Sequence, residues 1–192
     1  MAIKEGLAVK EKLAVLGGAP AMPEGIERTR WPRYSEEELE ELCRVLREEQ
    51  VGGSDAPQVV GLEQEWAQRI GVDYCSAVGA GSDALHMALW AAGVGSGDEV
   101  IVPAYTFMAG VLVVLHQGAV PVFVDVLPDS YNMDPALIEK QITPRTKAIL
   151  PVHLNGLPAD MDEINAIAQR HGIAVIEDMS HAPGAVYKGR PV

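Results

Sequence analysis

Three short segments of the sequence carry residue types that could together bind one small anionic ligand. Residues 78–85 read Val-Gly-Ala-Gly-Ser-Asp-Ala-Leu, a pattern that predicts a strand, a glycine-bearing turn and then a helix. Glycine lets the backbone approach a ligand closely, and the first N–H groups of a helix have no partner within that helix. We therefore expect the N–H groups of Ser82, Asp83 and Ala84 to form a cradle for a phosphate.

This first segment has two other interpretations. It could be a tight turn that Ser82 caps. It also fits G-x-G-x-x-A, the dinucleotide-binding fingerprint, which requires an acidic residue about 20 positions on, after the next strand. Asp98 and Glu99 instead precede that strand, so the fingerprint is a weak match.

The second segment places aromatic residues directly after a predicted strand at 100–102. Residues 103–107 read Pro-Ala-Tyr-Thr-Phe, and the chain has only two phenylalanines. At the end of a strand, Phe107 could stack on a flat heteroaromatic ring in the offset geometry that aromatic pairs prefer. The alternative is that Phe107 or Tyr105 packs in the core.

The third segment, residues 175–181, ends an apolar strand with two carboxylates, Glu177 and Asp178. A buried carboxylate is costly without a partner. A cation or the N–H of a pyridinium ring would be such a partner for Asp178; a cap on the next turn, or an Arg or Lys, is the alternative. His181 could contact the same ligand or be an ordinary loop histidine.

Together, a phosphate cradle, a stacking aromatic and a strand-end aspartate would bind a phosphorylated pyridine, pyridoxal 5′-phosphate (PLP). The aspartate would keep the ring nitrogen protonated and so strengthen the ring as an electron sink. Metal binding is poorly supported, because the five histidines show no ligand spacing with carboxylates or thiols. No Gly-x-Ser-x-Gly motif indicates a hydrolase.

The elements that must position these residues alternate between helices and apolar strands, which predicts an α/β fold with a mostly parallel sheet covered by helices, a three-layer sandwich. Residues 1–34 form an N-terminal arm in this prediction. A capping box at Ser35 opens the first helix, and a second ends near Gly71. The predicted strands are 74–78, 100–102, 120–124, 148–152 and 173–176, and the predicted helices between them are 82–92, 107–117, 135–142 and 161–170.

Composition limits the classes of function. The 192 residues hold 27 acidic and 15 basic side chains, a formal net charge of −12, which argues against a nucleic-acid binder. An apolar content of 48% argues against disorder. We expect a cytoplasmic chain with no membrane partner, since neither a signal peptide nor a long apolar segment is visible. Two cysteines are too few for a disulfide scaffold.

Several longer stretches carry a resemblance to a known family. They are 81–89, 97–107, 118–126, 142–149, 151–156, 159–161, 175–178 and 184–190. On these motifs the chain resembles the DegT/DnrJ/EryC1/StrS sugar aminotransferases, which are fold-type I PLP enzymes, from about Trp31 onward. The resemblance implies the PLP-binding large domain of that fold over residues 35–192, and a homodimer.

The resemblance also implies a role for each matching position. Gly81, Ser82 and Asp83 stand where the family binds the cofactor phosphate, chiefly through backbone N–H groups. Phe107 stands at the position that stacks on the PLP ring, and Asp178 at the one that pairs with the pyridine nitrogen. His181 stands where the family carries Gln or His near the ring hydroxyl. The implied reaction moves an amino group from glutamate or glutamine to a keto-sugar, often nucleotide-linked, or a keto-cyclitol, in antibiotic, lipopolysaccharide or other amino-sugar biosynthesis.

The resemblance covers about the first half of the family, so we expect the remainder of the large domain and the C-terminal small domain to be absent. The Schiff-base lysine of the family would lie beyond Val192, and no catalytic residue is expected within this chain. None of its six lysines aligns with that position: Lys4, Lys10, Lys12, Lys140, Lys147 and Lys188. We therefore expect the chain to be inactive alone. A sugar dehydratase of the same family, a non-catalytic regulator and a Rossmann-type nucleotide-binding protein remain as alternatives.

Overall fold

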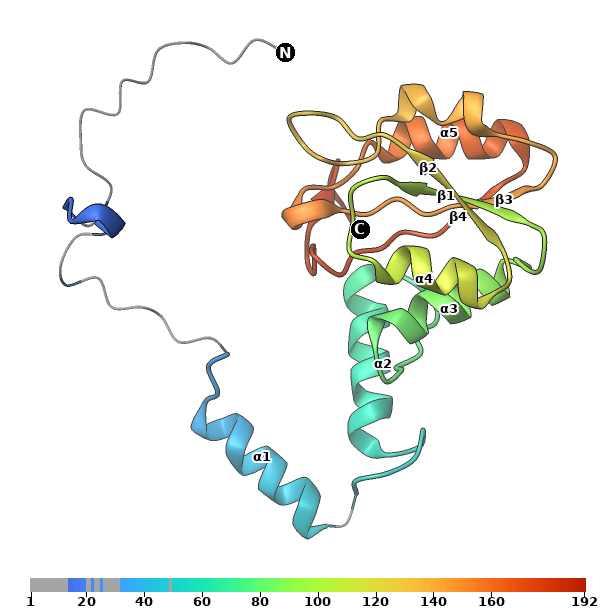
Figure 1. Cartoon of the computed structure of the whole chain (residues 1–192). Helices are drawn as coiled ribbons and strands as arrows, with labels where there is room; N and C mark the ends of the chain where they lie inside the picture. Colours follow the sequence, from blue (N-terminus) through green and yellow to red (C-terminus); the bar gives the residue numbers. More distant parts are fainter. Residues whose placement is uncertain (1–13, 20–21, 23–24, 26–31, 49) are drawn as a thin grey trace. The chain divides into compact units, whose positions relative to one another are not determined.

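The computed structural model describes residues 14–19, 22, 25, 32–48 and 50–192. The chain divides into two units, residues 1–51 and 52–192, and the second contains the sheet (Figure 1). Of the expected N-terminal arm, residues 1–13, 20–21, 23–24 and 26–31, Trp31 included, lie outside the described residues. The described remainder contains a 3₁₀ turn at Ala14–Leu16, and the arm's boundary at residue 34 stays a prediction.

The first unit contains helix α1, Glu36–Arg47, and it begins as the sequence predicts. The Ser35 Oγ accepts a hydrogen bond from the Glu38 N–H at 3.1 Å, and the Glu38 carboxylate accepts one from the Ser35 N–H at 2.6 Å. This confirms the capping box. Arg44 forms ion pairs with Glu41 and Glu48 one turn away on either side.

The second unit opens with α2, Pro57–Ile70, which ends at Gly71 in the left-handed region, φ +82°. The strand predicted at 74–78 is wrong. Within the described part of the chain this segment joins no sheet, and the Ala77 N–H donates to the Glu63 carboxylate of α2 at 2.8 Å instead of to a neighbouring strand.

Four strands form one parallel sheet in the order β2-β1-β3-β4. Their bounds are β1 Glu99–Pro103, β2 Val120–Val124, β3 Thr146–Ile149 and β4 Ala174–Val175. Helices α3 (Gly81–Ala91) and α4 (Ala109–His116) cover one face, and α5 (Met161–His171) covers the other (Figure 1). The predicted three-layer α/β arrangement is therefore confirmed.

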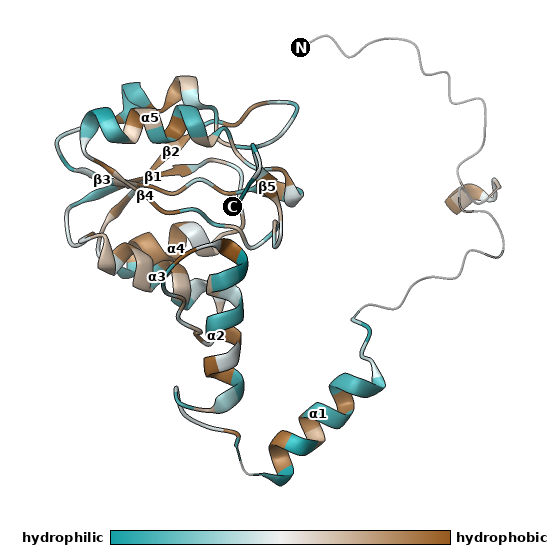
Figure 2. Cartoon of the chain, turned by 180° about the vertical axis from the view of Figure 1, so that it is seen from behind, coloured by the Kyte–Doolittle hydropathy of each residue, from teal (hydrophilic) through white to brown (hydrophobic). Residues whose placement is uncertain are grey.

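The alternation of side chains along β1 shows why the strands are apolar on both faces. Val100 and Val102 pack under α3 and α4, whereas Ile101 packs under α5; all three are fully buried. Helix α5 buries Ile164 and Ile167 against the sheet and leaves its polar residues exposed, whereas α4 is apolar almost throughout and leaves Leu112 and Leu115 exposed (Figure 2). Parallel strands buried in this way need the unbroken apolar runs found in the sequence.

The predicted helix at 135–142 is wrong in type. The structure has two 3₁₀ turns there, Pro135–Leu137 and Glu139–Gln141, with hydrogen bonds three residues apart. Asp134 caps the first turn by accepting from the Ala136 N–H at 2.9 Å. The segment still buries Ile138 completely in the core cluster that contains Ile101 and Ile164.

The rest of the second unit consists of short elements around the sheet. A 3₁₀ turn, Leu154–Gly156, follows β3, and an antiparallel pair, β5 (Val186–Tyr187) and β6 (Arg190–Pro191), lies near the C-terminus. None of the helices in the described residues is long and apolar enough to cross a membrane.

Candidate functional site: a cavity at the carboxyl ends of the strands

A cavity of about 210 Å³ lies where the strands of the parallel sheet end and α3 and α4 begin. Ligands of open α/β sheets bind at this edge. The cavity brings together five of the six predicted site residues, all except Asp83. Its lining consists of Gly81, Ser82, Leu85, Thr106, Phe107, Ala109, Val152, Asp178, Ser180 and His181.

The N-terminus of α3 contributes unpaired donors to this cavity. The helix starts after Ala80, and no side chain caps it, so the alternative in which Ser82 caps a turn is wrong. The N–H groups of Asp83 and Ala84 donate to the Ala80 carbonyl at 3.0 and 3.1 Å. In the described structure this leaves the N–H groups of Gly81 and Ser82 without a partner, two donors rather than the predicted three, at the positive end of the helix dipole.

Asp83 is placed differently from its neighbours. It lines an adjacent cavity between α3 and α4. A Cβ on Gly79 would come within 3.2 Å of its Oδ2, so the carboxylate lies against the turn before the helix. A carboxylate at the cradle would repel a phosphate, and Asp83 is not among the residues that line the first cavity.

Phe107 is not a core residue. Its side chain is 72% exposed, and it lines the cavity from the loop after β1, so the core-packing alternative is wrong for this residue. Tyr105 is also 59% exposed. An exposed aromatic ring at a cavity wall is free to stack on a flat ligand.

Asp178 reaches the cavity because the chain after β4 continues to pair with the chain after β3, although the pairing there is no longer a regular strand ladder. The Asp178 N–H donates to the Pro151 carbonyl at 2.9 Å, and the Asp178 carbonyl accepts from the His153 N–H at 3.0 Å. Its Oδ1 accepts two hydrogen bonds from Ser180, from N at 3.0 Å and from Oγ at 2.6 Å. The predicted turn-capping role is therefore real, but it uses one carboxylate oxygen, and Oδ2 has no partner among the described residues.

His181 also lines the cavity. Its Nδ1 accepts a long hydrogen bond, 3.5 Å, from the N–H of Asn155, a residue in the left-handed conformation at φ +53°. If Nδ1 accepts, the proton of the neutral imidazole resides on Nε2. His181 can therefore donate to an acceptor oxygen in the cavity.

A buried histidine, His153, holds the two carboxylate residues Glu177 and Asp178 in place. His153 is fully buried; its Nδ1 accepts from the Ala159 N–H at 3.0 Å, and its Nε2 lies 3.0 Å from Oε2 of Glu177. With Nδ1 as acceptor, Nε2 donates to the carboxylate. Since the His153 backbone also holds Asp178, this residue joins the ends of two strands at the cavity.

Comparison with known proteins decides the family. Residues 32–192 match the profile of the DegT/DnrJ/EryC1/StrS aminotransferase family. The chain belongs to this family. Its resemblance to sugar aminotransferases is thereby confirmed, and the dinucleotide-binding alternative loses its support, because no strand precedes the glycine turn at 79–81.

Three relatives illustrate the similarity. The chain is 52% identical over 136 residues to the erythromycin biosynthesis sensory transduction protein EryC1 of Saccharopolyspora erythraea, covering 71% of this chain and 37% of that one. It is 52% identical over 134 residues to UDP-2-acetamido-2-deoxy-3-oxo-D-glucuronate aminotransferase of Pseudomonas aeruginosa, covering 70% and 37%. The PLP-form of the putative sugar aminotransferase Spr1654 of Streptococcus pneumoniae has a TM-score of 0.76 and 32% identity, covering 83% and 44%.

The chain thus spans between a third and a half of the length of these family members. No lysine is among the residues that line the cavity. Lys188 forms an ion pair with Asp162 of α5, and this hydrogen bond raises the pKa of the lysine. A nucleophilic lysine needs a lowered pKa, so this position does not suit Lys188 for that role.

The residues present fit the phosphorylated pyridine of the family. Two unpaired N–H groups at Gly81 and Ser82 suit a phosphate, the exposed ring of Phe107 suits an aromatic face, and the unpartnered Oδ2 of Asp178 suits a ring N–H. Among the described residues, no group of three His, Cys, Asp or Glu side chains could hold a metal ion.

Sequence reasoning missed two residues that complete the site. Ser180 stands two positions after Asp178, the spacing at which an aspartate accepts from a following backbone N–H, so its partner could have been found. His153 carries no such signal, because its role depends on the loop from 154 to 159 folding back over it.

Proposed function

We propose that this chain is the cofactor-binding part of a PLP-dependent aminotransferase that transfers an amino group from glutamate or glutamine to a keto-sugar, often nucleotide-linked, or a keto-cyclitol. The carrying observation is the cavity in which Gly81, Ser82, Phe107, Asp178 and His181 meet. Relatives whose names state sugar transamination support the substrate class. We propose that this reaction is a step of amino-sugar biosynthesis.

Each side chain or backbone group has a distinct task. The N–H groups of Gly81 and Ser82 bind the phosphate, and the dipole of α3 adds to their attraction. Phe107 covers one face of the ring, and Asp178 binds the ring N–H and keeps it protonated. His181 donates from Nε2 to the ring hydroxyl oxygen. Asp83 faces away from the phosphate.

The cofactor, when bound, supplies an electron sink and carries the amino group between donor and acceptor. The groups described here bind and orient it, and none of them forms a covalent bond to it. We therefore propose that the 192 residues hold the cofactor by non-covalent contacts alone and do not transaminate by themselves.

The proposal includes a homodimer in the cytoplasm, with no nucleic-acid or membrane partner. Two cysteines, Cys43 and Cys75, are free and half-buried, as suits a reducing compartment. The acidic balance, 27 acidic against 15 basic residues, suits neither a nucleic acid nor an anionic membrane surface.

The test is calorimetry of cofactor binding to the 192-residue chain. The ligand is pyridoxamine 5′-phosphate (PMP), the amino form of the cofactor, which binds without forming a bond to a lysine. We expect one molecule of PMP per chain. Treatment of the PLP-loaded chain with borohydride should leave its mass unchanged after denaturation. Absence of PMP binding, or a stable covalent adduct, would overturn the proposal.

A further inference from the structure

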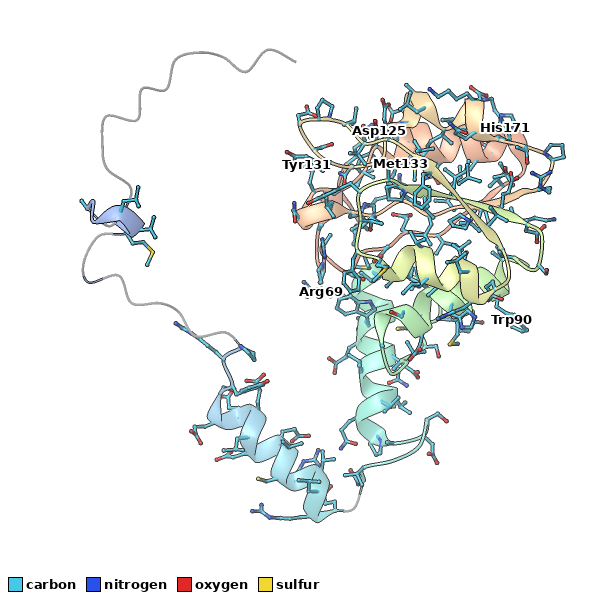
Figure 3. The ribbon with its side chains drawn as sticks, in the orientation of Figure 1. Arg69, Trp90, Asp125, Tyr131, Met133 and His171 are labelled. Atoms are coloured by element: carbon cyan, nitrogen blue, oxygen red, sulfur yellow. The ribbon has the colours of Figure 1, made fainter. Side chains whose placement is uncertain are left out.

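Two tyrosines form an exposed aromatic pair beside the cavity. Tyr105 follows β1 and Tyr131 follows β2; their ring centroids are 5.5 Å apart with planes at 43°. The rings are 59% and 50% exposed. Figure 3 shows Tyr131 and Asp125 on one side of the sheet unit, and Trp90 of α3 and His171 of α5 on the other side.

The backbone of Tyr131 is held in an unfavourable conformation. Its φ is +60°, in the left-handed region where a Cβ is crowded and glycine is favoured. The surrounding loop enforces this: the Tyr131 N–H donates to the Leu127 carbonyl, and the Leu127 N–H donates to the Asn132 carbonyl, both at 2.9 Å. Residues held in such conformations cluster at ligand sites, and this one carries an exposed aromatic ring.

The next residue anchors the loop. Asn132 is buried, its amide nitrogen donates to the carbonyls of Leu157 and Pro158 at 2.9 and 3.1 Å, and its Oδ1 accepts from the Leu154 N–H at 3.0 Å. These bonds fix the tyrosine loop to the segment after β3. The Tyr131 ring is therefore presented to solvent on a rigid support.

The pair lies close to the cavity along the chain. Tyr105 lies two residues before Phe107, and two residues span at most about 7 Å. This limit keeps a ring held on the tyrosines near a ring held against Phe107.

We propose that Tyr105 and Tyr131 form a platform for the sugar or cyclitol ring of the amino acceptor. The proposal rests on the proposed function for its substrate class. The C–H face of a pyranose packs against aromatic faces, and the phenol hydroxyls can donate to and accept from the hydroxyls of the sugar. The platform selects the ring of the acceptor, and a nucleotide attached to it lies outside the tyrosine pair.

The test is saturation-transfer NMR with UDP-N-acetylglucosamine, measured on the full chain with and without PMP. The informative variant is Tyr131→Gly, because glycine adopts φ +60° without strain and keeps the loop while removing the ring. Tyr131→Phe keeps the stacking face. Tyr74→Ala removes a tyrosine that is 90% exposed and outside the pair, and is the matched control.

We expect saturation of the pyranose protons above that of the uracil protons. Tyr131→Gly should weaken binding by about threefold to tenfold, without lowering the melting temperature; Tyr131→Phe and Tyr74→Ala should retain affinity. Stronger saturation of uracil than of sugar, or unchanged affinity in Tyr131→Gly, would overturn the platform even where PMP binds normally. Failure of PMP binding with sugar saturation intact would instead count against the proposed function alone.

Discussion

Ser180 donates both of its hydrogen bonds, from N at 3.0 Å and from Oγ at 2.6 Å, to the same oxygen of Asp178. Because Oδ1 is used in this way, the carboxylate is fixed in rotation while Oδ2 stays unpartnered in the described structure. A carboxylate held so firmly at a cavity loses little side-chain entropy when it binds a ligand. The two hydrogen bonds from Ser180 therefore orient the half-buried Asp178 carboxylate so that Oδ2 can accept a hydrogen bond from a ring N–H.

Replacing Asp178 with asparagine tests this role. In Asp178→Asn the amide oxygen can still accept from Ser180, so the turn should persist and the melting temperature should change little. The charge that holds a protonated ring nitrogen is lost, and PMP affinity should fall by about tenfold or more, the usual worth of a hydrogen bond to a charged group. Calorimetry of the variant checks this. Asp162→Asn, which removes a surface carboxylate paired with Lys188, should bind PMP normally.

The phosphate cradle can be tested at the backbone. Gly81 is the first residue of α3, where proline is well tolerated, and Ala80 before it is extended at φ −157° and ψ 158°, as a residue before proline must be. Gly81→Pro should thus keep the helix and remove one of the two free N–H donors. We expect PMP affinity to fall by roughly tenfold while pyridoxamine, which lacks the phosphate, binds as before. Equal losses for both ligands would mean that the donor does not serve the phosphate.

Much of this site could be predicted from the sequence because it depends on local chemistry. Residues 79–84 indicate a glycine turn before a helix, and Asp178 is the second of two carboxylates that follow an apolar run. What could not be predicted depends on partners distant in the sequence. The segment at 74–78 has strand-like residues, but the Ala77 N–H bonds to Glu63 on α2 and not to another strand.

Other differences between the predictions and the structure also depend on geometry that the residue types do not encode. Of the three predicted donors at α3 only the Ser82 N–H is free within the described structure, because the Asp83 and Ala84 N–H groups both bond to the Ala80 carbonyl; the second free donor is Gly81, one residue earlier than predicted. The 135–142 segment has helical spacing, yet its hydrogen bonds close over three residues, a difference that the residue types do not encode. Tyr131 shows no signal at all, since tyrosine is an unusual choice at positive φ.

A buried acid at the opposite edge of the sheet predicts a pH effect on stability. The pKa of Glu99 is lowered from its ordinary 4.5, first by the hydrogen bond from Thr143 at 2.6 Å and also by Arg145. A lowered folded-state pKa stabilises the fold above the unfolded-state pKa and loses that contribution as pH falls through the folded-state value. We expect Glu99→Gln to be less stable than the wild type near about pH 7, with a smaller difference near about pH 3, in urea denaturation. A difference independent of pH would contradict this.

The buried His153 should be a neutral imidazole with its proton on Nε2, because Nδ1 accepts from Ala159. Long-range proton–nitrogen NMR correlations would identify the tautomer. Two variants separate its bonds: His153→Asn can keep the acceptor for Ala159, whereas His153→Gln can keep the donor to Glu177. Each should cost about 1–3 kcal/mol of unfolding free energy, the penalty for an unpaired buried group. Observation of the Nδ1–H tautomer would show that the assigned donor and acceptor are reversed.

The most direct test of the cofactor site is a nitrogen-15 NMR titration of the 192-residue chain with PMP. We expect the amide signals of Gly81 and Ser82 to move furthest with PMP, together with those around Asp178 and Phe107. Inorganic phosphate should move only the signals of Gly81 and Ser82. Saturation of these shifts at one PMP per chain would support the site. Shifts confined to other segments, or none at millimolar PMP, would contradict it.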